Sequence, residues 1–181
     1  MSDEKSTYER AHFGIIKFVH DTLYRVFVNP HEWLRATGLA AGQRVLEVGC
    51  GPGFFTIPAA ETVGERGRVY ALDNNPAAVE YVKRKVQLRA VRNVEVILAD
   101  AAKTGIPDGS LDVVFLFGVL HALWDDVDSV LKEAHRVLRA GGTLSIRSRL
   151  PEEQVIDGVT RSGKFRLLRI SDGVLNFENV Q

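Results

Sequence analysis

Short apolar segments alternate with amphipathic helical patterns along most of the chain, and this alternation constrains the fold more than any other feature. The apolar segments of strand length are "QRVLEVG", "GRVYALD", "VEVILAD", "LDVVFLFG" and "TLSIRSRL". Strands that alternate with helices form βαβ units, whose strands lie parallel in one sheet with right-handed crossovers. Because the segments are apolar throughout, we expect helices on both faces of the sheet. The sequence therefore predicts an α/β, doubly wound fold.

The carboxyl-terminal part of the chain has a different pattern. A short helical segment, "PEEQVIDGVTRSG", precedes two strand-like runs, "KFRLLRI" and "VLNFENV", which are joined by Asp172-Gly173. An Asp-Gly pair between two such runs is typical of a tight hairpin. We therefore expect a Rossmann-like sheet of seven strands, six parallel and the terminal one antiparallel, and 181 residues suit a single domain of this kind.

A glycine-rich loop, "VGCGPGFF", follows the first apolar segment directly. Such a loop lies at the carboxyl edge of a parallel sheet, where open α/β folds bind ligands. The spacing differs from the dinucleotide fingerprint G-x-G-x-x-G, because Phe54 stands where its third glycine belongs and Gly53 comes one residue earlier. Pro52 also removes one backbone N–H donor. The loop therefore suits a ligand less anionic than a pyrophosphate, and a tight turn without a ligand is the alternative.

An acidic residue ends each of the next two apolar segments. Asp73 closes "VYALD", where a carboxylate can accept hydrogen bonds from both hydroxyls of a ribose. Asp100 closes "VILAD", where a carboxylate can reach the exocyclic amino group of a base. Either acid alone would more often cap a turn. Together with the glycine loop, in this order, they indicate a site for an adenosine without phosphates.

These motifs resemble those of a known family. "VLEVGCGPG", "VYALDNNP", "VEVILADA", "LDVVFLFGVLHAL" and "RVLRAGGTLSI" match, in order, the motifs of class I S-adenosylmethionine-dependent methyltransferases. The resemblance is greatest to the branch that contains the ubiquinone/menaquinone C-methyltransferases and many small-molecule methyltransferases. It covers about residues 41–150, and the terminal hairpin is similar to the family's reversed last strand. It implies S-adenosylmethionine as the cofactor and S-adenosylhomocysteine as its product.

The resemblance also implies which residues bind the cofactor. They are Glu47, Gly49, Cys50, Gly51, Gly53, Asp73, Asn74, Asp100, Ala101, Phe117 and Gly118. The residues from Glu47 to Gly53 would hold the methionine portion, with Glu47 near its amino group and Cys50 as an unreactive small side chain.

The remaining residues of this set would bind the nucleoside and the sulfonium. Asp73 would bind the ribose hydroxyls, and Asn74 would lie along the adenosine. Asp100 would accept a hydrogen bond from the adenine amino group, and Ala101 would offer a backbone N–H to the ring. The pair that ends the fourth segment, Phe117-Gly118, would line the sulfonium through backbone carbonyls.

The segment after the fourth strand bears on the methyl acceptor. Methyl transfer needs orientation more than a catalytic dyad. The stretch "FGVLHALW" lacks the [N/D]-P-P-[Y/F/W] motif of adenine and glutamine N-methyltransferases, so we expect an oxygen or carbon nucleophile on a small molecule. His121 is the candidate catalytic residue, as a general base near neutral pH, and the alternative is that it only packs at the start of a helix. Trp124 is either a wall of the acceptor pocket or ordinary core.

The first forty residues are predicted to form a separate helical element. From Tyr8 to Val28 the apolar residues follow helical spacing. We expect residues 1–40 to form an amino-terminal helical lid and residues 41–181 to form the methyltransferase core. Contact of this helix with a lipid-like acceptor or a membrane surface is an alternative.

Composition excludes several kinds of partner. Lys plus Arg and Asp plus Glu are both 23, so no basic surplus favours nucleic acid, and we interpret the basic stretch at 83–92 as a solvated helix face. The single cysteine cannot form a cysteine-based metal site, and it fits a cytoplasmic protein. No segment is apolar enough for stable membrane insertion, and the polar start predicts no secretory signal. A homodimer could complete the acceptor pocket. An NAD-binding oxidoreductase and a non-catalytic, cofactor-binding partner subunit remain the rival functions.

Overall fold

The computed structural model describes residues 29–180. The helix expected at Tyr8–Val28 lies outside these residues, and so does most of the expected lid. From that lid the described part contains α3 (Pro30–Ala36), whose amino-terminal end is capped by Asn29: the Oδ1 atom accepts a hydrogen bond from the His31 N–H at 3.1 Å.

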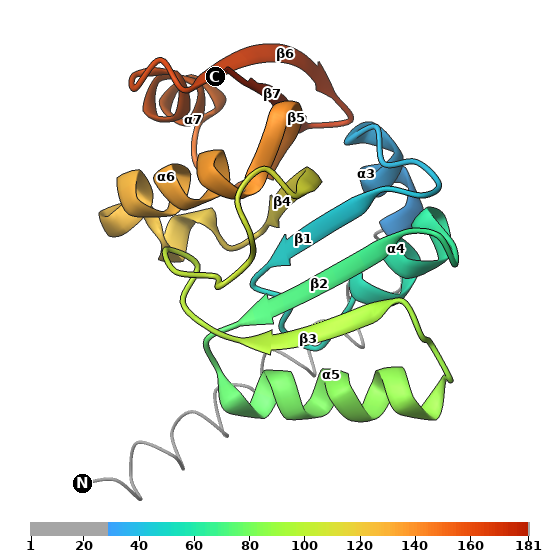
Figure 1. Ribbon diagram of the computed structural model, residues 1–181. Helices are drawn as coiled ribbons and strands as arrows, with labels where there is room; N and C mark the ends of the chain where they lie inside the picture. The colour runs from blue at the N-terminus through green and yellow to red at the C-terminus, as the bar shows by residue number, and fades with distance from the viewer. Residues whose placement is uncertain (1–28, 181) are drawn as a thin grey trace, which may run out of the picture.

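One mixed sheet of seven strands forms the centre of the molecule, in the order β3-β2-β1-β4-β5-β7-β6 (Figure 1). The strands are β1 (Arg44–Val48), β2 (Arg68–Asp73), β3 (Val94–Leu98), β4 (Leu111–Phe117), β5 (Leu138–Arg147), β6 (Phe165–Ser171) and β7 (Val174–Asn179). Strands β1 to β5 pair in parallel, and β7 pairs antiparallel with both β5 and β6. Six strands therefore run in one direction and the terminal strand opposes them, which confirms the predicted fold class.

Helices cover both faces of the sheet, because neighbouring residues of each strand point to opposite sides. On β1, Val45 packs with residues of α3 and of α4 (Thr56–Val63), and the same face carries α5 (Pro76–Leu88). Leu46 packs instead with α6 (Val127–Val137) and α7 (Glu152–Thr160). The two apolar clusters sandwich the sheet, as the apolar strand sequences predicted.

The stretch "NPAAVEYVKRKVQLR" predicts a helix with Asn75 as its N-cap and Pro76 at its first position, and α5 begins in this way. Asn75 is the N-cap, and its Oδ1 atom accepts a hydrogen bond from the Ala77 N–H at 2.9 Å, while Pro76 occupies the first helical position. Asp172 and Gly173, with φ of 50° and 70°, form the tight turn between β6 and β7. The hairpin prediction is therefore confirmed.

The boundary between α6 and β5 differs from the predicted one. The apolar residues of "DVDSVLKEAHRVLRAGG" follow helical spacing and predict a helix closed by Gly141-Gly142, but α6 ends at Val137 and β5 begins at Leu138. The amide of Asn179, on β7, donates to the carbonyls of His135, Leu138 and Arg139 at 3.2, 3.0 and 3.1 Å. A residue some forty positions away thus satisfies carbonyl groups that the end of a helix leaves without partners.

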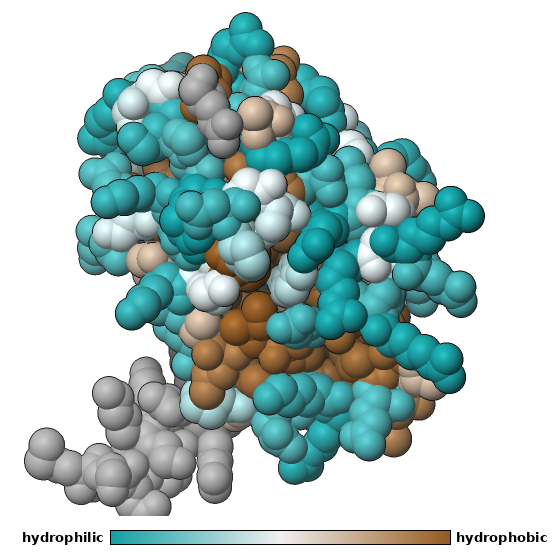
Figure 2. Space-filling view, viewed as in Figure 1, coloured by the Kyte–Doolittle hydropathy of each residue, from teal (hydrophilic) through white to brown (hydrophobic). Residues whose placement is uncertain are grey.

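The end of the sheet at β3 is less covered than its centre. Figure 2 shows an apolar area over this strand, bordered by polar side chains. Leu98 is 53% exposed, whereas every residue of β4 except Asp112 is buried. The chain passes from β3 to β4 through a loop without a helix, which leaves this edge strand open on the α6 side. Among residues 29–180, no helix is long and apolar enough to cross a membrane.

Candidate functional site

The glycine loop lies at the carboxyl edge, between β1 and α4, where the strand order reverses between β1 and β4. Gly49 and Gly51 have φ of 73° and 49°, a backbone region that favours glycine. A Cβ on Gly49 would lie 2.6 Å from Cγ1 of Val119, so any side chain there would clash with the β4 loop. A Cβ on Gly51 would meet no atom within 4 Å, so this part of the loop faces open space.

The N–H groups of the glycine loop are all used within the protein. Those of Gly49 and Cys50 both donate to the carbonyl of Leu72, at 2.8 and 2.9 Å. The Gly53 N–H donates to the Cys50 carbonyl at 2.8 Å, and the Gly51 N–H donates to a carboxylate. Pro52 has no N–H. The loop therefore offers no free backbone donor between residues 49 and 53, and a pyrophosphate would find no cradle there.

That carboxylate belongs to Asp73, the last residue of β2. Its Oδ2 atom accepts from the Gly51 N–H at 2.8 Å, and its Oδ1 atom accepts from the Asn75 N–H at 2.9 Å. Asp73 thus joins the glycine loop to the turn before α5. Each carboxylate oxygen can accept more than one hydrogen bond, so the half-buried group retains capacity for a ligand. The sequence predicted its place at this edge but not the bond to Gly51.

A buried carboxyl group lies beneath the loop. Glu47, on β1, is 2% exposed, and the Thr56 hydroxyl at the start of α4 donates to its Oε2 atom at 2.5 Å. Burial raises the pKa of the Glu47 carboxyl to about 8, against the opposing effects of the Thr56 hydrogen bond and the Lys85 charge. A cationic group placed beside it would favour the ionised carboxylate.

Lys85, on α5, also contacts the loop. Its ammonium donates to the carbonyls of Gly53 and Pro52 at 2.6 and 3.0 Å. The interpretation of the stretch 83–92 as a solvated face is wrong for this residue, although Lys83 and Arg84 are exposed. The helical spacing of Lys85 with the buried Val82 and Val86 was the signal that could have revealed its inward direction.

The acid that follows β3 lies at the same edge but is engaged in a turn. Asp100 is exposed, and its Oδ1 atom accepts a hydrogen bond from the Ala102 N–H at 2.8 Å, with Ala101 buried between them. Asn74, after β2, is exposed. Since β2 and β3 are neighbours, Asp73 and Asp100 reach the same edge, as the sequence predicted for the two strand ends.

The end of β4 completes the edge beside the loop. The ring of Phe117 is buried against Phe115 and Phe55, at centroid distances of 4.7 and 5.0 Å. Gly118 has a φ of 75°, and a Cβ there would meet nothing within 4 Å, so its backbone faces open space.

The candidate base and the second tryptophan lie beyond Gly118. His121 is exposed on a short turn, η2 (Leu120–Ala122), and its imidazole has no hydrogen-bond partner among residues 29–180. Trp124 is half-buried against α7, where a Cβ on Gly158 would lie 2.8 Å from its ring. Together with Pro151 and the exposed face of α7, this ring lines an open groove.

Cys50 lies in the glycine loop and is the one cysteine of the chain. The Cys50 thiol is buried, and burial raises its pKa well above the usual range, as does the nearby Glu47 carboxyl. An inert thiol is consistent with the interpretation of Cys50 as a small side chain. Within residues 29–180, no group of three or more His, Cys, Asp or Glu residues could hold a metal ion.

Comparison with known proteins identifies the family. Residues 46–146, more than half of the chain, match the methyltransferase domain family. The chain belongs to this family. The family prediction is thus confirmed, and an NAD-binding oxidoreductase is not favoured by the match or by the occupied N–H groups of the loop.

The methyltransferase domain is also similar to individual proteins. It is 37% identical over 110 residues to demethylmenaquinone methyltransferase of Geobacillus stearothermophilus, covering 60% of this chain and 46% of the relative. It is 35% identical over 107 residues to aklanonic acid methyltransferase DauC of Streptomyces sp. (strain C5), covering 59% and 48%. The chain thus matches about half the length of these curated relatives.

A solved structure matches the methyltransferase domain over nearly its whole length. This SAM dependent methyltransferase from Aquifex aeolicus superposes with a TM-score of 0.81 and 27% identity, over 93% of this chain and 98% of that chain. The predicted cofactor, S-adenosylmethionine, agrees with this match and with the family. The roles of the individual residues remain predictions.

Proposed function

We propose that this chain transfers a methyl group from S-adenosylmethionine to an oxygen or carbon atom of a small molecule. One observation carries the proposal: residues 49–53 of the glycine loop have no free N–H donor, and three carboxyl groups, Glu47, Asp73 and Asp100, lie beside them at the carboxyl edge. Such a site is poor for phosphates and suits a ligand that combines cationic groups with hydroxyl and amino donors.

The proposed assignments distribute these groups along the cofactor. Glu47 and the open surface at Gly51 hold the methionine portion, while Asp73 accepts hydrogen bonds from the ribose hydroxyls. Asp100, with Ala101, binds the adenine, and Asn74 lies along the nucleoside. The bound cofactor supplies a methyl group made electrophilic by a sulfonium.

The proposed acceptor lies beyond the backbone of Phe117 and Gly118. The relatives are named for a quinone and for an acid, which supports a small organic acceptor. His121, exposed and close in sequence to Gly118, is proposed to accept a proton from an acidic acceptor.

Residues 1–40 are proposed as the lid of this site, above the core formed by residues 41–181. The position of α3 supports this arrangement, because its Trp33 ring stacks on Phe55 of the glycine loop at a centroid distance of 5.4 Å. A cytoplasmic location, a homodimer and the absence of a nucleic-acid partner are predictions that rest on the sequence.

Calorimetric titration tests the cofactor proposal directly. We expect S-adenosylhomocysteine to bind the full chain, and NAD to give no heat of binding. Asp73→Asn removes the charge and one acceptor, so the affinity should fall by about tenfold or more. The matched control Asp128→Asn, an exposed carboxylate on α6, should bind as the wild type does. Tight NAD binding without any response to S-adenosylhomocysteine would overturn the proposal.

A further inference from the structure

An arginine lies at the carboxyl edge beside the end of β4. Arg147 is the last residue of β5 and pairs directly with Phe117, the last residue of β4. Its carbonyl accepts a hydrogen bond from the Gly118 N–H at 2.9 Å. The Arg147 side chain therefore starts next to the backbone that is proposed to separate the methyl donor from its acceptor.

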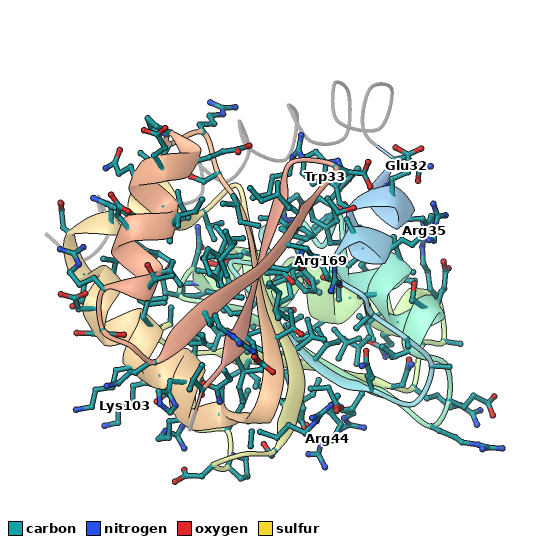
Figure 3. All side chains as sticks on the ribbon, turned by 90° about the horizontal axis from the view of Figure 1, so that it is seen from above. Glu32, Trp33, Arg35, Arg44, Lys103 and Arg169 are labelled. Atoms are coloured by element: carbon teal, nitrogen blue, oxygen red, sulfur yellow. The ribbon has the colours of Figure 1, made fainter. Side chains whose placement is uncertain are left out.

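The guanidinium of Arg147 bridges two elements distant in the sequence. Its Cζ atom lies 4.0 Å from the ring centroid of Trp33, on α3, and its Nη1 atom donates to the carbonyl of Asp172 in the β6–β7 turn. Figure 3 shows Trp33 between α3 and the end of this hairpin. A guanidinium over an indole face is held in orientation by a cation–π contact.

The positive charge of Arg147 has no carboxylate partner among residues 29–180: a neutral carbonyl and an aromatic ring are its contacts. Another half-buried arginine shows the contrast, since Arg136 pairs with both Glu133 and Asp108. A guanidinium has five N–H donors in one plane, and its strongest partners are anionic oxygens. Arg147 therefore keeps donors and a net charge available at the edge.

Aromatic rings flank this charge. Trp33 stacks on Phe55 with an interplanar angle of 22°, and its edge meets Phe117 at a centroid distance of 5.8 Å. Phe54 lies against Phe55 at 4.9 Å. Phe55 and Phe117 are buried and support the cluster from below, while the half-buried Trp33 and Phe54 are the rings that a flat, apolar ligand ring could contact.

We propose that Arg147, oriented by Trp33, binds an anionic oxygen carried by a planar ring of the methyl acceptor. The inference rests on the proposed function and names the class of acceptor: an aromatic or quinonoid molecule with a carboxylate or an enolate. In this role Arg147 is a positioning residue that sets the distance between the acceptor ring and Gly118. The alternative is that Arg147 only holds the β6–β7 hairpin against α3. This structural role uses the same contacts within the protein but requires no bound anion.

Calorimetry with matched probes separates the two roles. The full chain is saturated with S-adenosylhomocysteine and titrated at neutral pH with two matched pairs of probes. The first pair compares the anion naphthoate with the neutral naphthamide. The second compares hydroxynaphthoquinone, present as its enolate, with the neutral methoxynaphthoquinone. We expect at least one anion to bind about tenfold or more tightly than its neutral partner. The pair that shows this preference distinguishes a carboxylate acceptor from an enolate acceptor. Equal binding within both pairs would overturn the inference.

Variants then assign the preference to Arg147. Arg147→Met should abolish the preference for the anionic probe. Arg147→Gln, which keeps a polar side chain without the charge, should abolish the preference as well, and Arg147→Lys should retain part of it. The control Arg169→Met removes the same charge from β6, where the guanidinium lies 3.5 Å from the Ala36 carbonyl (Figure 3), and should keep the preference.

The same titrations keep the two proposals apart. If Arg147→Gln lowers the melting temperature but keeps the preference for the anion, Arg147 is only a brace and the inference is wrong. If the wild type binds S-adenosylhomocysteine but shows no preference between probes, the inference fails and the proposed cofactor function stands. If the wild type does not bind S-adenosylhomocysteine at all, the proposed function itself fails.

Discussion

The carboxyl group of Glu47 lies in a buried environment that disfavours its ionised form. Burial dominates and raises its pKa to about 8 from an ordinary value of 4.5. The folded protein therefore keeps a proton that the unfolded chain releases at lower pH. Stability from this group is fully present below about pH 4.5 and is lost as the pH rises through about 8.

We predict that Glu47→Gln removes this pH dependence. The glutamine carbonyl can still accept the Thr56 hydrogen bond, but it carries no proton to lose. In the absence of ligand, the free energy of unfolding of the wild type should fall relative to the variant between pH 5 and pH 8, by a few kcal/mol at most. Urea unfolding at several pH values measures the difference. Parallel curves for the two proteins would show that the carboxyl group titrates normally.

Thr56 and Lys85 contact the candidate site, although their residue types and sequence positions did not predict these contacts. The sequence placed Glu47 beside the glycine loop, but the partners of the loop and of the carboxyl group come from α4 and α5. Their contacts depend on how these helices pack, which no local pattern specifies. By contrast, Asp73 and Asp100 were placed correctly because a strand end fixes their position along the chain.

At the scale of elements, local signals determined some boundaries and distant contacts determined others. Asn75-Pro76 predicted the start of α5, because an N-cap and a first-turn proline act within a few residues. The end of α6 could not be predicted in the same way, since the carbonyls there are satisfied by Asn179 from the last strand.

We predict that Asn179→Ala destabilises the fold. The substitution leaves the buried carbonyl of Leu138 and the partly buried carbonyls of His135 and Arg139 without this donor, which should lower the free energy of unfolding by about 1–3 kcal/mol. Chemical denaturation with equal slopes for both proteins would measure this cost. Asn74→Ala, at an exposed position, should change stability by less than about 0.5 kcal/mol. An Asn179→Ala midpoint equal to that of the wild type would mean that the junction holds without this side chain.

At the scale of the whole molecule, the candidate site joins four elements on the β1 side of the switch point. β1, β2, α4 and α5 all contribute groups that contact the glycine loop or the acids beside it. A ligand bound at this junction acts on elements that unfold together with the sheet. Its binding free energy should therefore appear in the stability of the entire domain.

We predict that S-adenosylhomocysteine at about a hundred times its dissociation constant stabilises the protein by about 2.7 kcal/mol. For a domain of this size the melting temperature should rise by roughly 5–10 °C, as measured by scanning calorimetry. Asp73→Asn should reduce the shift at the same ligand concentration. A ligand that binds in the titration but leaves the melting temperature unchanged would show that it binds the unfolded chain equally well.

Every N–H group of residues 49–53 in the glycine loop is hydrogen-bonded within the protein before any ligand arrives. Its shape is therefore a product of folding and needs no induced fit, so little conformational entropy is left to lose when a ligand docks. The free energy of contacts between a ligand and this loop should therefore contribute almost fully to the binding affinity. The ligand binds a loop that is already rigid. Discrimination between ligands then depends on shape and on carboxylate geometry, because the loop cannot remodel itself around a wrong one.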